Sequence, residues 1–254
     1  MDSIEQLSLL IRESTCTVFF GGAGVSTESG IPDFRSESGL YNTHLNYGMA
    51  PEELLSHSLF MKDPSLFFRY YRENLVSRHV KPNAAHLALS KLEACGLLHA
   101  VITQNIDGLH QASGSRNVLE LHGSNWRHTC MNCARRYDLD YVLNPEHIVD
   151  DVPLCETCGG IVRPDVVLYE EMIDDDIYTS SSDAVSHADV MIVGGTSLAV
   201  SPANGLMGLY EGNKLVVINH SPTFADSKAL LVINDSIGSV LDGAVRLALE
   251  TPPG

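Results

Sequence analysis

The sequence predicts an α/β protein in which a doubly wound, mainly parallel sheet carries a second, smaller domain. Six short segments read as strands, and most are nearly continuous apolar runs, as expected for parallel strands covered on both faces. Helical patterns lie between several of these segments, which is the alternation typical of doubly wound sheets. Two other stretches of the 254-residue chain interrupt this alternation. The expected strands span residues 15–20, 98–103, 117–122, 189–194, 214–219 and 230–233.

Two helical patterns are the clearest. Residues 83–96 place apolar side chains on one stripe and end at Gly96, a residue that favours a helix C-terminus. Residues 236–250 begin at Ser236, which can cap a helix N-terminus, and again keep their apolar residues on one face. We expect both helices to pack on the sheet.

The two interruptions define the expected domain organisation. Residues 36–83 carry serine, asparagine and proline, followed by an aromatic helical pattern, and residues 129–161 carry two cysteine pairs. We expect these stretches to form the small domain, as a helical insert and a metal-binding module. The remaining segments would form a Rossmann-like domain: residues 1–35, 84–128 and 162–250.

Composition excludes several classes of protein. The chain has 16 basic and 32 acidic residues and a net charge of −16, which argues against nonspecific nucleic-acid binding because that depends on neutralising phosphates. No apolar run approaches the length of a membrane span. The first residues lack the basic region of a signal peptide. We expect a cytoplasmic protein that binds neither nucleic acid nor membranes.

Four of the six cysteines form two C-x-x-C pairs, with 21 residues between the inner cysteines. Structural Zn²⁺ sites prefer four tetrahedral thiolates, and a C-x-x-C turn directs two sulfurs at one ion. We therefore expect one structural Zn²⁺ in a ribbon. A redox-active pair is the alternative, but two pairs in one insert argue against it. The other two cysteines, Cys16 and Cys95, are expected in the core. The expected zinc ligands are Cys130, Cys133, Cys155 and Cys158.

A glycine turn follows the first expected strand, in the stretch "GGAGVSTESGIPDFR" at residues 21–35. The first two glycines of the dinucleotide fingerprint G-x-G-x-x-G are present, and Thr27 occupies the third position. The turn predicts a bound phosphate, and the missing glycine predicts altered helix packing. Because Pro32 does not continue a helix, Phe34 and Arg35 are expected to project from a loop over the turn.

Polar residues follow the other expected strands, where ligands collect in open α/β sheets. Gln104, Asn105 and Asp107 offer amide and carboxylate groups suited to ribose hydroxyls or a carboxamide. His122 ends another expected strand, where it could act as a general base. Small polar residues follow two further strands: Thr196, Ser197 and Asn219. Such residues suit ribose and phosphate contacts, although they also form ordinary turns.

Together, these motifs resemble the sirtuins, which are NAD-dependent protein lysine deacylases. The resemblance covers residues 17 to about 240, and its blocks occur in the family's order. The blocks are "GAGVSTESGIPDFR", "TQNIDGLH", "LELHGS", the two cysteine pairs, "GGIVRPDVV", "GGTSLAVSPA" and "VVIN". The resemblance implies NAD as co-substrate, one structural Zn²⁺ and acetylated lysine side chains of proteins as partners.

The resemblance also implies roles for individual residues. His122 would accept a proton, Gln104 and Asn105 would hold the nicotinamide ribose, and Ile106 and Asp107 would face the carboxamide. Four further residues would line the NAD loop: Ala23, Thr27, Phe34 and Arg35. Four others would hold the adenosine half of NAD: Thr196, Ser197, Asn219 and Ile237. The stretch "VVLYEE" matches the family's substrate strand and implies peptide contacts at Val166, Val167 and Tyr169. It departs from the family at two positions, because Tyr169 and Glu170 stand where Phe and Gly are typical.

The family's chemistry transfers the acetyl group to ADP-ribose and releases nicotinamide. Two alternatives remain open, a protein ADP-ribosyltransferase and a non-catalytic module that binds NAD and zinc. Sirtuins that favour succinyl or malonyl groups carry a tyrosine and an arginine three residues apart in the helical insert. Here Tyr41 and Tyr47 are followed at that spacing by His44 and Ala50, so we expect neutral acyl groups.

An acidic stretch, "EEMIDDD", follows the expected substrate strand at residues 170–176. Asp174–Asp176 are expected at a helix N-terminus, where the helix dipole favours negative charge. Alternatively, Glu170 and Glu171 face the peptide and favour basic substrate sequences.

Overall fold

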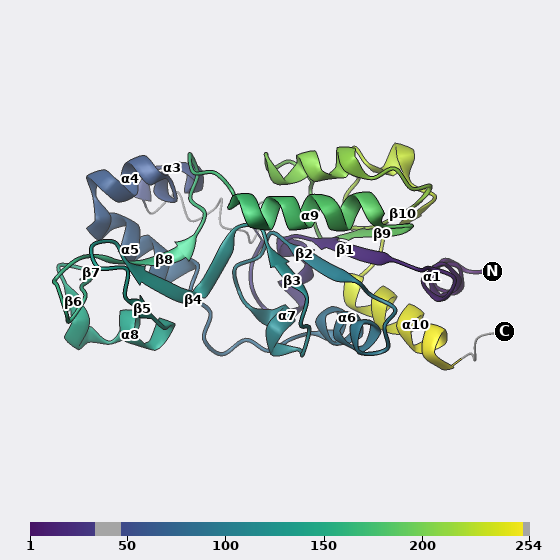
Figure 1. Cartoon of the computed structure of the whole chain (residues 1–254), viewed down its shortest axis with the longest axis horizontal. Helices are drawn as coiled ribbons and strands as arrows, with labels where there is room; N and C mark the ends of the chain where they lie inside the picture. Colours follow the sequence, from purple (N-terminus) through teal and green to yellow (C-terminus); the bar gives the residue numbers. More distant parts are fainter. Residues whose placement is uncertain (34–46, 251–254) are drawn as a thin grey trace.

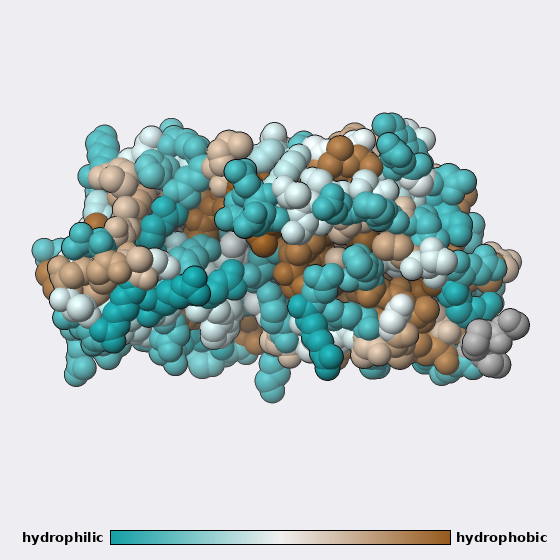
Figure 2. All heavy atoms as spheres, viewed as in Figure 1, coloured by the Kyte–Doolittle hydropathy of each residue, from teal (hydrophilic) through white to brown (hydrophobic). Residues whose placement is uncertain are grey.

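The computed structural model describes residues 1–33 and 47–250. Figure 1 shows an elongated molecule with a large α/β part, which holds both termini at its far end, and a smaller part at the other end. Figure 2 shows mainly hydrophilic side chains on this face, with apolar side chains visible between them. Within the described ranges, no helix has the length and apolar character that a membrane span requires.

The large part contains a six-stranded sheet in the order β11-β10-β9-β1-β2-β3, and every neighbouring pair of strands is parallel. The predicted fold class is confirmed, and each expected strand forms, most of them shorter at one or both ends. The order places β1, the strand before the glycine turn, near the middle of the sheet. The strands are β1 (Thr17–Gly21), β2 (Ala100–Thr103), β3 (Val118–Glu120), β9 (Val190–Gly194), β10 (Lys214–Ile218) and β11 (Leu231–Ile233).

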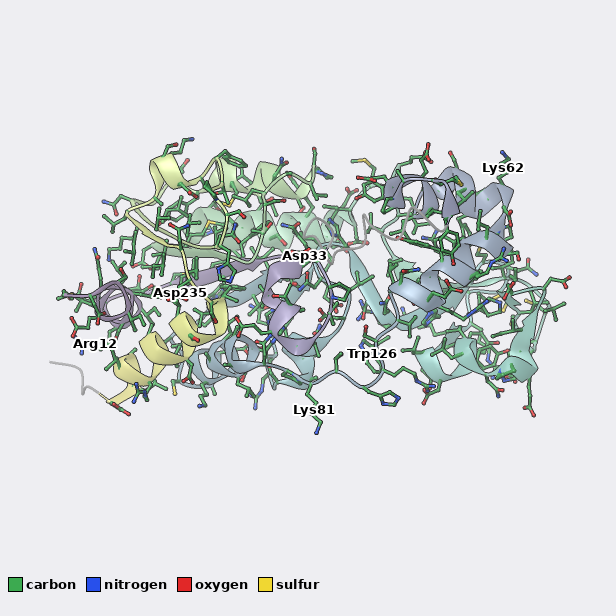
Figure 3. All side chains as sticks on the ribbon, turned by 180° about the vertical axis from the view of Figure 1, so that it is seen from behind. Arg12, Asp33, Lys62, Lys81, Trp126 and Asp235 are labelled. Atoms are coloured by element: carbon green, nitrogen blue, oxygen red, sulfur yellow. The ribbon has the colours of Figure 1, made fainter. Side chains whose placement is uncertain are left out.

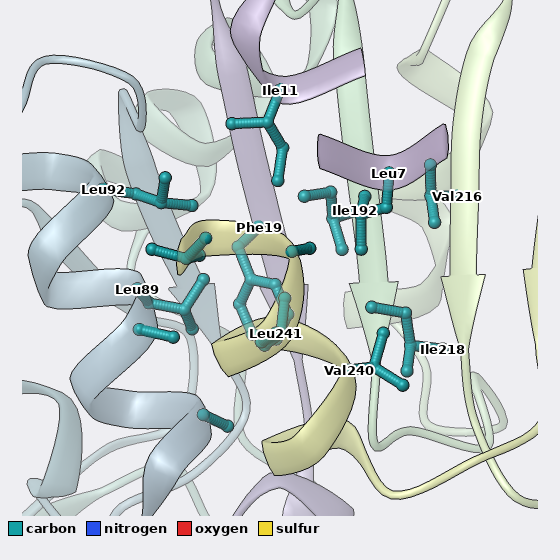
Figure 4. Close-up of a cluster of buried hydrophobic side chains, with 14 of the residues drawn as sticks. Leu7, Ile11, Phe19, Leu89, Leu92, Ile192, Val216, Ile218, Val240 and Leu241 are labelled. Atoms are coloured by element: carbon teal, nitrogen blue, oxygen red, sulfur yellow. The ribbon is translucent and has the colours of Figure 1, made fainter. Parts of the chain in front are cut away.

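Three helices cover one face of this sheet: α1 (Ser3–Arg12), α6 (Ala84–Ala94) and α10 (Ile237–Glu250). Their apolar stripes bury Leu89 and Leu241 against Phe19 of β1, in the cluster that Figure 4 shows. The two helices predicted from sequence are α6 and α10. Ser236 accepts a hydrogen bond from the backbone N–H of Ser239, as expected of a residue that caps α10.

The opposite face is covered by α9 (Asp175–His187) and the 3₁₀ segment η5 (Ala203–Leu209). Successive strand residues point to opposite faces, so Val18 and Phe20 pack here while Phe19 packs on the other side. Asp174 caps α9 by accepting from the backbone N–H groups of Asp176 and Ile177. The prediction of a helix N-terminus at this acidic stretch is confirmed.

The small part combines a helical insert with short antiparallel sheets. The insert contains α3 (Pro51–Leu54), α4 (His57–Lys62) and α5 (Pro64–Asn74), and its aromatic side chains form a buried cluster of edge-to-face and stacked rings. The sheets contain β4 (Gly123–Cys130), β5 (Arg136–Tyr137), β8 (Val162–Val166), β6 (Ile148–Val149) and β7 (Val152–Pro153), with α8 (Leu139–Leu143) and η4 (Pro145–His147) beside them.

The strands β4 and β8 pair with each other in the three-stranded sheet β5-β4-β8. Strand β4 crosses the expected start of the cysteine module at residue 129, and β8 begins directly after its expected end at residue 161. The domain division of the chain therefore stays a prediction, and these two strands physically connect the segments that it separates.

Three buried histidines add a pH dependence to the stability of the fold. Burial lowers the pKa of His86 to about 4, of His110 to about 3 and of His128 to about 4. Neither ring nitrogen of His110 has a hydrogen-bond partner among the described residues. These side chains are therefore neutral in the folded protein at pH values where the unfolded chain would protonate them.

We predict that the free energy of unfolding falls as the pH drops below the ordinary histidine pKa of 6.5. In that range the unfolded state binds more protons than the folded state, so the slope that each of these histidines contributes rises toward about 1.4 kcal/mol per pH unit as the pH approaches 5. Urea unfolding of wild type and His110→Leu between pH 6.5 and pH 5 measures this slope. The variant should show the shallower pH dependence, and identical slopes would contradict the prediction.

Candidate active site

A cavity of about 660 Å³ lies beyond the carboxyl ends of β1, β2, β9 and β10, where the large sheet meets the small part. Ligands bind at this edge in open parallel sheets. The described residues predicted to bind NAD or peptide all line this cavity: Ala23, Thr27, Gln104, Asn105, Ile106, Asp107, His122, Val166, Val167, Tyr169, Thr196, Ser197, Asn219 and Ile237. Four residues named in the sequence analysis lie outside the described residues: Phe34, Arg35, Tyr41 and His44.

Two glycine turns meet at the floor of the site. The N–H of Gly24, after β1, donates to the carbonyl oxygen of Gly195, after β9, over 2.8 Å. A Cβ atom on Gly24 would lie 2.8 Å from the Cα atom of Gly195, and one on Gly22 would lie 2.9 Å from Cβ of Thr196. The fingerprint glycines are therefore required by contact between the two turns.

The missing third glycine of the fingerprint coincides with a change in local structure. Residues Ala23–Val25 and Thr27–Ser29 form two short 3₁₀ segments, η1 and η2, in place of a long α-helix. The prediction of altered helix packing is confirmed.

The N-terminus of α10 is already occupied by a carboxylate. Glu28 Oε1 accepts from the N–H of Gly238 at 3.0 Å and from Oγ of Ser236 at 2.9 Å. An acidic side chain thus satisfies the helix end that could otherwise bind an anion.

A hydrogen-bonded network joins the loop after β2 to the glycine turn. Asn105 Nδ2 donates to the carbonyl oxygen of Gly22 and to Oγ of Ser26, both at 3.1 Å. Ser26 in turn donates to Oδ2 of Asp107 at 2.7 Å. Ser26 is buried and was missed in the sequence analysis, where its position directly after the glycine turn was the only signal. The network fixes the amide and the carboxylate relative to each other.

Two contacts reach from the same loop to other parts of the site. Gln104 Nε2 donates to Oγ1 of Thr196 at 3.2 Å, which connects the loops after β2 and β9. The backbone oxygen of Gln104 lies 2.9 Å from Nδ1 of His122. The predicted residues from different strand ends are thus in direct contact.

The neutral ring of His122 is held in one tautomer. A carbonyl oxygen only accepts, so Nδ1 carries the proton, and the lone pair is on Nε2. Burial lowers the pKa of His122, and the hydrogen bond to Gln104 offsets part of this effect. The ring is therefore a neutral imidazole near pH 7 that can accept a proton at Nε2.

The expected substrate strand connects the two parts of the molecule. Val167 N–H donates to the carbonyl oxygen of His122 at 3.0 Å. Tyr169 pairs with the helical insert, because its N–H donates to Leu55 and its carbonyl oxygen accepts from the N–H of His57, both at 3.0 Å. The segment is fixed at both ends before any peptide binds.

Two glutamates stabilise this segment. Burial raises the pKa of Glu171, but hydrogen bonds from Arg163 and from the N–H of Leu168 outweigh it and lower the pKa to about 2. Glu170, at the position typically occupied by Gly, has φ of 76°, and its carboxylate accepts from the N–H of Ser58 at 2.8 Å. The left-handed backbone explains why Gly is typical at this position. Both carboxylates line the cavity but are engaged within the protein.

The four predicted zinc ligands converge in the small part, with all four sulfur atoms within 4.8 Å of one another. The Cys130–Cys158 and Cys133–Cys155 sulfur pairs are 3.5 and 3.7 Å apart. Tetrahedral coordination at a Zn–S distance of ~2.3 Å requires a separation of about 3.8 Å, so the cluster fits Zn²⁺. Tyr137 Oη lies 2.9 Å from the sulfur of Cys155 and can donate to its thiolate.

The cysteines outside this cluster differ in burial. Cys95 is exposed because it ends α6 as its C-cap residue, so its predicted core position is wrong. Cys16 is partly buried.

The fold and the site together define an NAD-binding α/β protein with a four-cysteine metal module. Residues 22–202 match the model of the Sir2 family. An NAD-dependent protein deacetylase of Clostridium acetobutylicum is 54% identical over 245 residues, covering 96% of this chain and 99% of the relative. One of Clostridium tetani is 56% identical over 246 residues, covering 97% and 98%.

Solved structures agree with these relatives. A Sir2 protein with a deacetylated p53 peptide and 3′-O-acetyl ADP ribose superposes with a TM-score of 0.89 at 36% identity, covering 96% of this chain and 98% of that chain. A Sir2 protein bound to acetylated peptide superposes with a TM-score of 0.83 at 36% identity, covering 98% of each. The chain belongs to the Sir2 family.

We predict about one Zn²⁺ per chain, bound by the four cysteines. Cys155→Ala should lower both the metal content and the melting temperature, because the binding free energy of structural zinc contributes to folding. Elemental analysis and thermal unfolding measure both effects. Cys95→Ala, which removes an exposed thiol outside the cluster, is the control and should retain both. Full zinc occupancy and unchanged melting of Cys155→Ala would refute the site.

Proposed function

We propose that this NAD-dependent protein deacetylase removes acetyl groups from lysine side chains with His122 as its general base. The observation that carries the proposal is the neutral imidazole of His122, whose Nδ1 is committed to Gln104 and whose Nε2 is left to accept a proton. His122 lines the same cavity as Asn105 and Asp107. A base must lie within reach of its proton in a bound substrate, and this cavity offers the space for one.

Asn105 and Asp107 would orient the nicotinamide half of NAD. The Ser26 network fixes both side chains, so no reorganisation is required when NAD binds. Gln104 and Asn105 would contact the ribose, and Ile106 and Asp107 the carboxamide. On the other side of the cavity, Thr196, Ser197, Asn219 and Ile237 would hold the adenosine half.

NAD supplies the ADP-ribose group that accepts the acetyl group. Asp107 and the neighbouring carbonyl groups would stabilise positive charge that develops at the ribose when nicotinamide leaves. The acetyl oxygen of the substrate would bond to the ribose carbon as nicotinamide leaves it. Nε2 of His122 would then accept the proton of the neighbouring ribose hydroxyl group, so that its oxygen attacks the acetyl carbon, and release of the lysine amine with addition of one water molecule would complete the transfer. The products are lysine, nicotinamide and O-acetyl-ADP-ribose. Val166, Val167 and Tyr169 would bind the peptide beside His122.

The charge of the cavity supports a preference for neutral acyl groups. Among the described residues that line the cavity, none is a lysine or an arginine. Near the substrate strand the lining includes the apolar residues Leu55, Leu75 and Ile106. An acyl carboxylate would therefore lose its hydration without gaining a positive partner from these residues.

We predict that His122→Ala lowers deacetylation by about 10²- to 10⁴-fold while the protein still binds NAD and acetyl-peptide. Exchange of labelled nicotinamide into NAD should persist, because nicotinamide leaves before the base is needed. Asp107→Asn is the matched contrast and should impair the exchange itself. A folded His122→Ala protein with near-normal deacetylation would overturn the assignment of the base.

The lowered pKa of His122 sets the expected pH dependence. Because the free enzyme carries a neutral imidazole, kcat/KM for deacetylation should be flat from pH 7 upward to about pH 8 and should fall only below the ordinary histidine pKa of 6.5. Steady-state rates across this range test the prediction. An acid limb centred at or above pH 7 would mean that His122 is not the titrating base.

A further inference from the structure

Trp126 is the only tryptophan of the chain, and it lies directly behind the loop that carries Asp107. Figure 3 labels it where the large and small parts meet. Its side chain is 46% exposed. Trp126 is not among the described residues that line the large cavity. Any effect of Trp126 on the reaction therefore has to pass through the loop that carries Asp107.

The indole makes two contacts with this loop. Nε1 donates to the carbonyl oxygen of Asp107 at 2.7 Å. The ring also lies against Gly108, where a Cβ atom would approach Cδ1 of Trp126 to 2.6 Å. Gly108 has φ of 73°, a left-handed conformation that favours glycine. The backbone at Gly108 and the absence of a Cβ atom there allow the indole to pack directly on the loop.

An irregularity in β4 directs Trp126 toward the loop. The pairing of β4 with β8 shifts register between Ser124 and His128, and such bulges re-aim side chains. Asn125, inside this irregularity, donates its N–H to Ile106 at 2.9 Å and its Nδ2 to Leu75 at 2.7 Å. The strand thus holds two consecutive carbonyl groups of the loop, those of Ile106 and Asp107.

The loop is therefore held from both sides. Inside the site, the Asp107 carboxylate accepts from Ser26 at 2.7 Å and from the N–H of Leu109 at 2.9 Å. Outside it, Trp126 holds the backbone of the same residue. The inner contacts orient the carboxylate relative to Ser26 and to the N–H of Leu109, and the outer contact fixes the Asp107 backbone relative to β4.

We propose that Trp126 is a positioning residue for the nicotinamide end of NAD, acting through the backbone of Asp107. The inference rests on the proposed role of Asp107. The new residue, Trp126, lies on β4. This strand begins directly after His122 and ends at Cys130 of the cysteine cluster. Base, loop anchor and metal module are thereby placed along one segment of chain.

Trp126→Phe tests the inference because it retains an aromatic ring over Gly108 and removes the N–H donor. The KM for NAD and the concentration of nicotinamide needed for half inhibition should both rise by about three- to tenfold, the effect of one lost hydrogen bond. The KM for acetyl-peptide should stay unchanged. Arg127→Ala, an exposed neighbour on the same strand that pairs with Glu120, is the control and should leave all three values unchanged.

The outcomes separate the two proposals. If Asp107→Asn impairs nicotinamide exchange but Trp126→Phe leaves the NAD and nicotinamide values within twofold of wild type, the positioning role is wrong and the proposed function stands. Equal shifts for NAD and peptide would also contradict it, because they indicate general loosening of the strand. If Asp107→Asn leaves exchange intact, the proposed function fails at that residue.

Tryptophan fluorescence gives a second test in the wild-type protein. Since all indole emission comes from Trp126, NAD without peptide should change it in a saturable way, and Asp107→Asn should shift the midpoint of the titration to higher NAD. Free N-acetyltryptophanamide corrects for collisional quenching and absorption by NAD. A wild-type response no different from that of the free indole, at NAD concentrations that saturate deacetylation when peptide is present, would contradict the inference.

Discussion

The contact between the glycine turns after β1 and β9 is the constraint on which the site depends. The hydrogen bond from Gly24 to Gly195 is possible only because neither turn has a side chain at the point of approach. β1 and β9 are paired up to Gly21 and Gly194, and this contact joins the two segments beyond the end of the pairing, where both turns line the cavity. Asn105 then binds the carbonyl oxygen of Gly22, so the loop after β2 is fixed by the same turn.

The small part completes the site through two connections. The segment after β8 binds the backbone of His122 on one side and the helical insert on the other. Strand β4 begins directly after His122 and ends at Cys130 in the cysteine cluster. One strand therefore connects the cysteine cluster to the site, while four thiolate ligands would leave no position for a substrate at the ion. The chemistry stays in the cavity and the module stabilises its wall.

Local patterns in the sequence predicted the large sheet and the polar residues at its edge, because a strand that is apolar throughout is recognisable and the polar residue after it must lie at the sheet edge. The resemblance to the sirtuins added Ala23, Ile237 and the substrate strand. Contacts between distant segments were not predictable in the same way. The serine at position 26 gained its importance from Asp107, 81 residues away. Cys95 is exposed because it ends α6. Its apolar neighbours in the sequence had instead predicted a position in the core. The bulge that directs Trp126 depends on pairing with β8.

In the proposed reaction, the cavity transfers an acetyl group from lysine to the ADP-ribose of NAD. Mass spectrometry of the products formed from an acetyl-lysine peptide and NAD tests it most directly. We expect equal amounts of deacetylated peptide, nicotinamide and O-acetyl-ADP-ribose. A peptide that retains its acetyl group and gains ADP-ribose would instead identify a transferase that modifies its protein substrate, and the complete absence of nicotinamide release would show that the site binds NAD without consuming it.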